Sequence, residues 1–208
     1  MNPRAEVCIH PTAIVETDHI GAGTRIWAFA HVMAGARIGR DCNLCDQAYI
    51  EGGAIIGDGV VVKNRALIYD GVTIEDGAFI GPAVVFTNDK SPRSRHLEEA
   101  RERYEAPEHW LETTRVGRGA AIGAGAVIVC GITIGSHATI GAGAVLTRDA
   151  EPHGLYVGNP AVRIGYVCCC GRRLSAAMVC TDCGRQYEPD ETGALREEVH
   201  SHDAAGVV

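Results

Sequence analysis

Four cysteines near the carboxyl end of the chain have a spacing that is typical of a metal site. Cys168 and Cys170 form one pair, Cys180 and Cys183 form a second pair, and a glycine follows each pair. Four thiolates presented by two such turns converge on a tetrahedral cation, for which zinc is the usual occupant. The first pair has one intervening residue instead of the commoner two, and a metal-free reduced tail is the alternative. The pattern predicts a structural zinc site, with Cys169 as a spare residue.

A polar segment from Thr87 to Arg115 holds a second group of chemically capable residues. Its first turn contains Asn88 followed by three basic residues in a chain of net charge −7, namely Lys90, Arg93 and Arg95. Guanidinium groups bind phosphate and carboxylate through paired hydrogen bonds, and an asparagine oxygen can orient an amine. The alternative is a solvated loop whose asparagine caps a turn. Arg101 and Arg103 read as ordinary solvated charges.

A six-residue period in the rest of the chain indicates what positions these groups. Every sixth residue from Ile20 to Phe86 is aliphatic or aromatic, and the pattern resumes from Val116 to Leu146. A small or branched residue lies two positions before most of these large ones, so both point to one face of a strand. Glycine often follows the large residue and permits a tight corner. The period predicts a parallel β-helix of hexapeptides, with three strands and three corners in each coil.

This pattern divides the chain into a repeat domain, a cysteine module and a tail. Residues 1–166 form the β-helix, with the long loop at 87–115 and a ragged first coil around Ile9 and Ile14 that is one residue out of phase with Ile20. A short helix is expected within 97–104. Residues 167–190 form the cysteine module, and residues 191–208 are expected to be disordered, with His200 and His202 solvated.

Composition and charge exclude several classes of protein. The acidic balance over 208 residues offers no basic patch, so nucleic acid is not an expected partner. The chain has no basic-then-apolar leader and no apolar run long enough to cross a membrane, so no membrane partner is expected. We therefore expect a cytoplasmic protein, and a cytosol keeps its nine cysteines reduced.

Six short motifs resemble the left-handed β-helix acyltransferases that use acyl-coenzyme A. They are Ile26-Trp27, Tyr69-Asp70-Gly71, Ile80-Gly81-Pro82, residues 86–94, Val129-Cys130-Gly131 and residues 157–161. Within this group the chain resembles nucleotide-sugar N-acetyltransferases that act on 3-amino sugars, in particular the UDP-2-acetamido-3-amino-2,3-dideoxy-glucuronate N-acetyltransferases of bacterial surface-polysaccharide and lipopolysaccharide pathways. The resemblance implies an all-β, left-handed parallel β-helix, a homotrimer, and acetyl transfer from acetyl-CoA to the amine of a nucleotide-linked sugar.

The resemblance also implies candidate site residues. Asn88 would lie beside the sugar amine, and His31 is a second candidate catalytic residue. His31 and His137 occupy outward positions of the repeat, where the loop of a neighbouring subunit could meet them and complete a shared site. The candidate substrate-binding residues are Lys63, Tyr69, Asp89, Lys90, Arg93 and Arg95. Candidate residues for binding coenzyme A, where small side chains let a pantetheine arm approach the backbone, are Ala124, Gly141, Ala142, Thr147, Asn159 and Arg163.

Two departures from the family pattern concern the proton that leaves the amine. The family often has Trp-His-Phe where this chain has Trp27-Ala28-Phe29, and often a histidine where this chain has Gln47. Both changes remove an ionisable group, so either another residue is the base or the departing coenzyme thiolate collects the proton. The sequence leaves open the sugar, the nucleotide (uridine or thymidine) and the acyl chain length.

Two other functions remain as alternatives. An O-acyltransferase, or one that uses a different acyl chain, would share the fold, but a hydroxyl acceptor needs a nearby base. A zinc carbonic anhydrase would need three convergent histidines, whereas the repeat proper carries His31 and His137 on distant turns. A catalytically silent scaffold is the remaining alternative.

Overall fold

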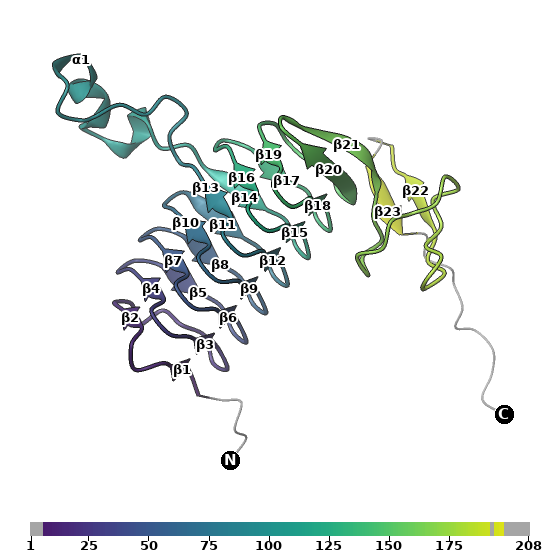
Figure 1. The fold of residues 1–208 in the computed structure, drawn as a ribbon, viewed down its shortest axis with the longest axis horizontal. Coiled ribbons are helices and arrows are strands. Elements are labelled where there is room, and N and C mark those ends of the chain that lie inside the picture. Colours follow the sequence, from purple (N-terminus) through teal and green to yellow (C-terminus); the bar gives the residue numbers. More distant parts are fainter. Residues whose placement is uncertain (1–5, 192–193, 198–208) are drawn as a thin grey trace.

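A computed structural model describes residues 6–191 and 194–197 and shows a parallel β-solenoid. Strands of mostly two residues stack along one axis into three parallel sheets, here named sheets A, B and C (Figure 1). Partner strands in adjacent coils pair in parallel, as Ile26 does with Leu44 and Leu44 with Val62. This spacing of three hexads per coil confirms the parallel β-helix that the period predicts.

The strand bounds follow this repeat. Sheet A contains β1 (Cys8–Ile9), β3 (Arg25–Ile26), β6 (Asn43–Leu44), β9 (Val61–Val62), β12 (Phe79–Ile80), β15 (Ala121–Ile122), β18 (Thr139–Ile140), β20 (Gly154–Gly158) and β21 (Ala161–Tyr166). Sheet B contains β2 (Ile14–Val15), β4 (His31–Val32), β7 (Tyr49–Ile50), β10 (Leu67–Ile68), β13 (Val85–Phe86), β16 (Val127–Ile128) and β19 (Val145–Leu146). Sheet C contains β5 (Arg37–Ile38), β8 (Ile55–Ile56), β11 (Val72–Ile74), β14 (Thr114–Val116) and β17 (Thr133–Ile134).

The core is a stack of aliphatic ladders along the axis of the solenoid. Both positions of the hexad face inward, as predicted: the large residues from Ile26 to Leu146 and the small residues from Ala30 to Ala144 are buried. The first coil is one residue out of phase with the coils that follow, as the sequence indicates, because Ile9 pairs with Ile26. Val15 pairs with Val32 and packs against the core, whereas Ile14 is 56% exposed. The phase of this coil is therefore set by Val15.

The long loop leaves sheet B after β13 and returns to sheet C at β14. It contains the short helix α1 (Glu98–Arg101), which the sequence predicts, followed by the 3₁₀ turns η1 (Glu102–Tyr104) and η2 (Pro107–His109). Figure 1 shows the loop projecting away from the solenoid. The return strand begins at Thr114, because this residue fills the small inward position and is 2% exposed.

The carboxyl-terminal segment closes the solenoid and continues into a small module. The antiparallel strands β20 and β21 end sheet A, and residues after Tyr166 carry a separate buried cluster of Cys168, Leu174, Cys180, Tyr187 and Leu195. Strand β22 (Tyr187–Pro189) pairs with β23 (Leu195–Glu197). The module thus extends beyond residue 190, and the expected disorder from 191 is wrong for β23, because Leu195 is buried in the cluster.

Residues 198–208, with the expected solvated His200 and His202, lie outside the described residues. Within the described part of the chain, no helix is long and apolar enough to cross a bilayer.

Candidate active site

The two arms of the loop are joined at its base, which we call the loop root. The backbone oxygen of Asn88 accepts a hydrogen bond from the backbone N–H of Glu112 at 2.9 Å. The ammonium of Lys90 lies 3.4 Å from a carboxylate oxygen of Glu112. The hydroxyl of Thr87 accepts a bond from the N–H of Cys130 at 3.0 Å, so the root is also tied to the next coil. Glu112 was not found by sequence reasoning, because nothing in the loop sequence indicates which residue faces Asn88.

The side chain of Asn88 is half-buried and has no hydrogen-bond partner among the described residues. It does not cap the turn that starts the loop. That bond is made by the carboxylate of Asp89, which accepts from the N–H of Ser91 at 2.8 Å. The amide of Asn88 is therefore available to a ligand at the point where coil and loop meet.

Asp89 was expected to bind the substrate, but its carboxylate is bonded to other residues of the loop. Its two carboxylate oxygens accept hydrogen bonds from the guanidinium of Arg103 at 2.5 and 3.1 Å, and the hydroxyl of Tyr104 donates a further bond at 2.6 Å. Burial opposes ionisation, but these hydrogen bonds outweigh it and lower the pKa of Asp89. The reading of Arg103 as an ordinary solvated charge is wrong for the same reason.

The three basic residues that were expected to bind an anion, Lys90, Arg93 and Arg95, are exposed on the loop. Lys90 is paired with Glu112, and a guanidinium nitrogen of Arg93 donates to the backbone oxygen of Pro92 at 2.8 Å. Arg95 is exposed and has no ion-pair partner in the described segments. Within the described part of one chain, these three side chains do not converge on a common point. They form a basic surface on the loop and not an anion-binding pocket.

His31 lies on sheet B, away from the loop root of its own chain. Its ring is 3.2 Å from the carboxylate of Glu16 and contacts the ring of Tyr49 edge-on at 5.7 Å, and Tyr49 contacts Tyr69 at 5.9 Å. A backbone bond from Ala34 and the contact with His31 lower the pKa of Glu16. Strand β4 is three places from β13 in sheet B, a separation of about 14 Å.

The other two substrate-binding candidates lie at different corners of the solenoid. Tyr69 follows β10 and sits one coil before Thr87 on the same corner, because Leu67 pairs with Val85. Lys63 follows β9, at the corner between sheets A and B. The structure therefore brings Tyr69 toward the loop root and keeps Lys63 on another edge.

His137 does not have the open surface position that the repeat suggests. Its ring stacks on His153 at 5.1 Å, and His153 contacts the ring of Tyr187 at 4.9 Å. Burial lowers the pKa of both histidines. The cysteine module covers this corner, which sequence periodicity could not show because the module lies outside the repeat.

Three of the candidate coenzyme residues lie on one corner, between sheets A and B. Ala124 and Ala142 are exposed on successive coils, and the backbone oxygen of Ala124 accepts a bond from Gly143 at 2.8 Å. A Cβ added to Gly141 would meet Val157 at 2.8 Å, so this corner adjoins the β20–β21 hairpin. The corner presents backbone and small methyl groups to solvent.

The remaining coenzyme candidates are less uniform. Asn159 lies exposed in the turn of the β20–β21 hairpin, and Thr147 lies exposed after β19. The guanidinium of Arg163 is paired with the carboxylate of Glu151 and lies 4.6 Å from the ring centre of Tyr166. Arg163 therefore has a structural partner, whereas Thr147 and Asn159 are open.

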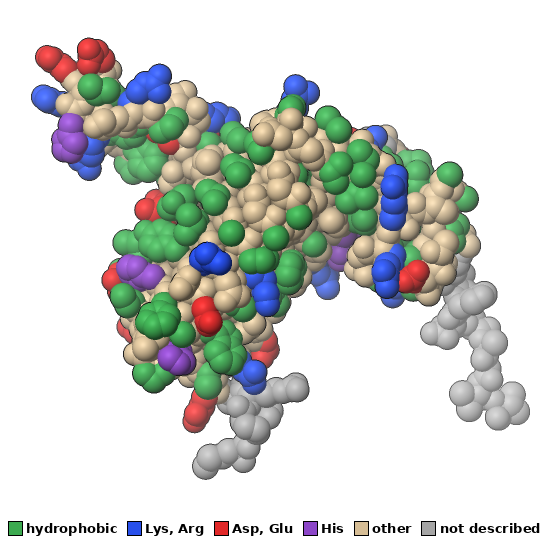
Figure 2. Space-filling model, viewed as in Figure 1, with side chains coloured by type: hydrophobic (Ala, Val, Ile, Leu, Met, Phe, Trp, Pro, Cys, Tyr) green, Lys and Arg blue, Asp and Glu red, His purple; other side chains and the backbone are tan. Residues whose placement is uncertain are grey.

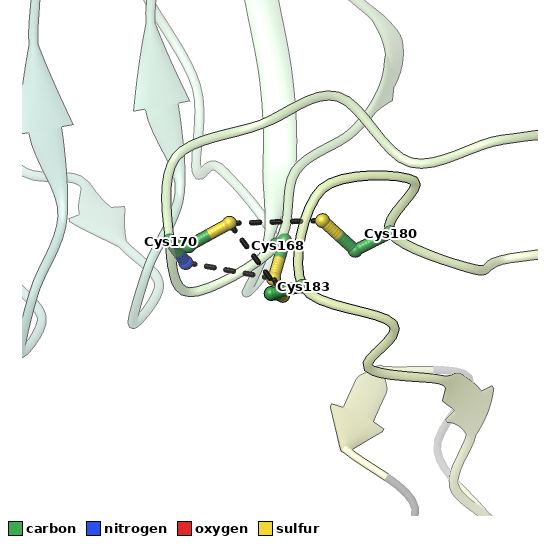
Figure 3. A group of neighbouring side chains, drawn as sticks. All are labelled: Cys168, Cys170, Cys180 and Cys183. Carbon is green, nitrogen blue, oxygen red and sulfur yellow. Dashed lines mark hydrogen bonds between the residues drawn. The ribbon is translucent and has the colours of Figure 1, made fainter.

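The four metal-ligand candidates are brought together as the spacing predicts. The Sγ atoms of Cys168, Cys170, Cys180 and Cys183 all lie within 4.8 Å of one another (Figure 3). Cys169 is exposed and outside the group. The cluster belongs to the carboxyl-terminal module and is separate from the loop root.

Comparison with known proteins agrees with this architecture. Residues 19–52, 53–88 and 113–148 match the family described as bacterial transferase hexapeptide (six repeats), and the unmatched gap coincides with the long loop. The dTDP-3-amino-3,6-dideoxy-alpha-D-galactopyranose 3-N-acetyltransferase of Aneurinibacillus thermoaerophilus is 47% identical over 192 residues, which is 90% of this chain and 94% of that protein.

Solved structures give more distant similarities. The acetyltransferase domain of PglB from Neisseria gonorrhoeae, in complex with acetyl coenzyme A, is 26% identical with a TM-score of 0.48, over 77% of this chain and 58% of that one. A variant of GDP-perosamine N-acetyltransferase from Caulobacter crescentus, in complex with CoA and GDP-perosamine, is 25% identical with a TM-score of 0.46, over 78% and 58%. This chain thus spans 58% of the length of each of these two chains. On the family match and the 47% identity, the chain belongs to the bacterial transferase hexapeptide family.

Proposed function

We propose that this protein transfers an acetyl group from acetyl-CoA to the amine of a nucleotide-linked 3-amino sugar, in the synthesis of a bacterial surface polysaccharide. The observation that carries the proposal is the 47% identity, over 90% of the chain, with an enzyme named for 3-N-acetylation of a dTDP-linked amino sugar. That relative acts on a thymidine nucleotide, whereas the sequence resemblance above pointed to a uridine nucleotide. Both nucleotides therefore belong in the test.

The chemistry requires little beyond alignment of the two substrates. The amine nitrogen attacks the thioester carbonyl, the carbon–sulfur bond breaks, and coenzyme A leaves as a thiolate. Placing the two groups in contact can contribute about 7–11 kcal/mol to the rate. The unpartnered amide of Asn88 supports its role in this step, because its oxygen can accept an amine hydrogen and direct the nitrogen lone pair.

We assign no histidine of the same chain as the base at the loop root. His31 is three strands away in sheet B, and His137 is packed against His153. The carboxylate of Asp89 is held by Arg103 and Tyr104. These placements support a route in which the amine proton passes to the leaving thiolate, with His31 of a neighbouring subunit as the competing base.

The coenzyme is proposed to lie along the corner of Ala124, Gly141 and Ala142, toward the hairpin turn at Asn159 and Thr147. The support is the small size of these residues and the exposed backbone beside them, since a pantetheine arm needs close approach to backbone groups. Arg163 is a weaker candidate because it is already paired with Glu151.

We further propose that the protein is a homotrimer whose site is shared between subunits. The outward row of sheet B is apolar, and a parallel sheet is normally covered on both faces. Its members in the middle and later coils are Tyr49, Leu67, Val85, Val127 and Val145. Figure 2 shows hydrophobic side chains gathered on this face. The loop leaves from the end of β13 in the same sheet, so a copy covering sheet B would meet it.

Steady-state kinetics with purified protein test the activity. The assay would follow release of free coenzyme thiol and a mass gain of one acetyl group on the sugar, with 3-amino sugars linked to dTDP and to UDP. The matched control is the same nucleotide sugar with a 3-hydroxyl group. Acetylation of the hydroxyl compound at a comparable rate would support the O-acyltransferase alternative and contradict the proposal.

A loop deletion tests the shared site. Removing residues 94–112 with a short linker should abolish turnover and leave the solenoid and the trimer intact, as judged by circular dichroism and light scattering. Retained activity would show that the loop is not part of the site, and a monomer for the intact chain at micromolar concentration would contradict the trimer. A cytoplasmic location is also proposed, and the nine unpaired cysteines support it.

A further inference from the structure

We propose that Cys168, Cys170, Cys180 and Cys183 bind one zinc ion, and that this ion folds residues 167–197 into a cap on the last coil of the solenoid. The inference is independent of acetyl transfer, because the cluster is remote from the loop root. Figure 3 shows the four sulfur atoms turned toward one common point from two separate chain turns.

The spacing of the sulfur atoms matches a tetrahedral metal site. The Sγ atom of Cys168 lies 3.5 Å from that of Cys183, and Cys170 lies 3.6 Å from Cys180 and 3.7 Å from Cys183. A zinc–sulfur bond of about 2.3 Å in tetrahedral geometry places neighbouring sulfurs about 3.8 Å apart. All four cysteines are free of disulfides. The group therefore has the size of a tetrathiolate zinc centre.

The two turns have closely similar backbone patterns. The N–H of Cys168 donates to the oxygen of Arg172 at 2.8 Å, and the N–H of Cys180 donates to the oxygen of Arg185 at 2.9 Å. In each turn the glycine after the second cysteine donates back to the first cysteine, and both glycines have positive φ. The shorter first turn thus closes in the same way as the commoner second one. Its single intervening residue does not prevent convergence of the sulfurs.

Groups around the sulfurs suit thiolates. The backbone N–H of Cys170 donates to the Sγ of Cys168 at 3.5 Å, and the guanidinium of Arg185 lies close enough to Cys183 to interact electrostatically. The hydroxyl of Tyr187 donates to the Sγ of Cys168 at 3.1 Å. Four thiolates and a divalent cation carry a net charge of −2. Hydrogen-bond donors stabilise this charge, and the neighbouring guanidinium of Arg185 partly neutralises it. Binding would release the thiol protons to solvent.

The module has few apolar residues to fold with. Among the residues that the structure describes, its buried cluster has three members besides two cysteines, namely Leu174, Tyr187 and Leu195. A core of this size is too small to order such a segment alone, and small domains of this kind commonly depend on a metal or disulfides. A metal bound by both turns would join the half of the module that contains Cys168 to the half that contains Cys180.

Tyr187 connects the cluster to the solenoid. Its hydroxyl contacts Cys168 and accepts a bond from the N–H of Cys169 at 3.0 Å, while its ring packs on His153. His153 is 7% exposed and bonds through Nδ1 to the oxygen of Val167 at 3.0 Å. Metal binding therefore fixes a ring that rests on the last corner of the coil.

Elemental analysis of the full chain, purified without chelator, tests the site. We expect about one zinc per chain, less than about a tenth of that in Cys180→Ser, and full occupancy in Cys169→Ser, whose thiol is not a ligand. Cobalt substitution should give the visible bands of tetrahedral thiolate coordination in Cys169→Ser and not in Cys180→Ser. Circular dichroism confirms that the solenoid of each variant is folded.

Two further measurements test whether the bound zinc also folds the module into a cap. Removal of zinc by chelator should expose residues 167–197 to protease while the solenoid resists. Tyr187→Phe, which keeps the ring and removes the hydroxyl, should weaken zinc binding by about 10- to 100-fold. Zinc below about a tenth of an equivalent in the intact chain, iron in its place, or equal loss in both cysteine variants would overturn the proposal, as would an unchanged protease pattern after metal removal.

Discussion

The guanidinium of Arg103 holds both carboxylate oxygens of Asp89, at 2.5 and 3.1 Å, across the base of the long loop. The Asp89 side chain is 9% exposed and the Arg103 side chain 30%. A paired, planar contact of this kind fixes geometry more firmly than a single surface ion pair. The contact joins the start of the loop, one residue after Asn88, to the turn η1.

Replacing Arg103 should therefore loosen the loop more than replacing a neighbouring arginine. Arg103→Ala leaves the Asp89 carboxylate half-satisfied, which costs about 1–3 kcal/mol, equivalent to about 5- to 150-fold in the population of open loops. Limited proteolysis between residues 90 and 112 measures this, together with kcat. Arg101→Ala is the matched control because Arg101 is exposed in the adjacent turn. Equal cleavage rates for the two variants would contradict the positioning role.

The fold could be predicted from the sequence because one local rule repeats. Each hexad carries its own evidence for which residues face inward, so Ile26, Ala30 and Val32 are assigned by the same pattern as Ile134, Ala138 and Ile140. The site does not have this property. Arg103 binds Asp89 and Glu112 binds Asn88, and both pairs are far apart in sequence and meet only when the loop closes.

The same reason explains the error at His137. The repeat correctly gives it an outward direction, but the covering residue, Tyr187, lies in the module beyond the repeat and acts through His153. The cysteine cluster is the opposite case. Its four cysteines form two pairs that are each close in sequence, so short-range spacing was sufficient to predict that they meet.

A glycine on the proposed coenzyme corner is required by the stacking of coils. A Cβ at Gly123 would lie 2.4 Å from the backbone nitrogen of Ala142, whereas a Cβ at Gly125 meets nothing within 4 Å. Gly123→Ala should therefore destabilise the solenoid by about 1–3 kcal/mol. Gly125→Ala bears only the cost of a left-handed backbone, about 1–2 kcal/mol, so it should be the milder change. Thermal unfolding without ligand compares them; a lower Tm for Gly125→Ala would contradict the stacking argument.

The contact of His153 with the cap should weaken in mild acid. Burial lowers the pKa of His153, although its bond to Val167 opposes the shift. The unfolded chain has a histidine pKa of about 6.5, so the contact contributes fully above that pH and is progressively lost as the pH falls from there through the lower folded value. Glu197 favours protonation of both histidines, while Arg118 opposes that of His137.

Thermal unfolding from pH 7.5 to 5.5 would measure this effect, with protease accessibility of residues 167–197 as a local probe. His153→Gln removes one of the two histidines whose pKa is lowered and should reduce the pH dependence, leaving the share of His137. His19→Gln is the control, because His19 is exposed, and it should behave as the unsubstituted chain does. A slope as steep in His153→Gln as in the unsubstituted chain would show that His153 does not contribute to it.

The role of Asn88 can be separated from that of a histidine base by three substitutions. If its amide directs the sugar amine, Asn88→Ala should lower kcat by about 10- to 100-fold, because one orienting hydrogen bond contributes about 1–3 kcal/mol. The loss should be incomplete, since the rest of the site still aligns the substrates, and coenzyme A binding should change less than kcat. His31→Ala and His137→Ala should each cost less than Asn88→Ala.

Asn64→Ala provides the matched control for this series. Asn64 is half-buried and occupies the same hexad position as Asn88, two residues after a buried strand residue, but at a corner that carries no loop. It should retain normal kcat, which would show that loss of an asparagine at this type of corner is harmless in itself. Near-normal kcat for Asn88→Ala together with a thousandfold loss for His31→Ala would instead make His31, supplied by a neighbouring subunit, the general base. That outcome would move the proton-transfer step from the coenzyme thiolate to the subunit interface, because His31 cannot reach the loop root of its own chain.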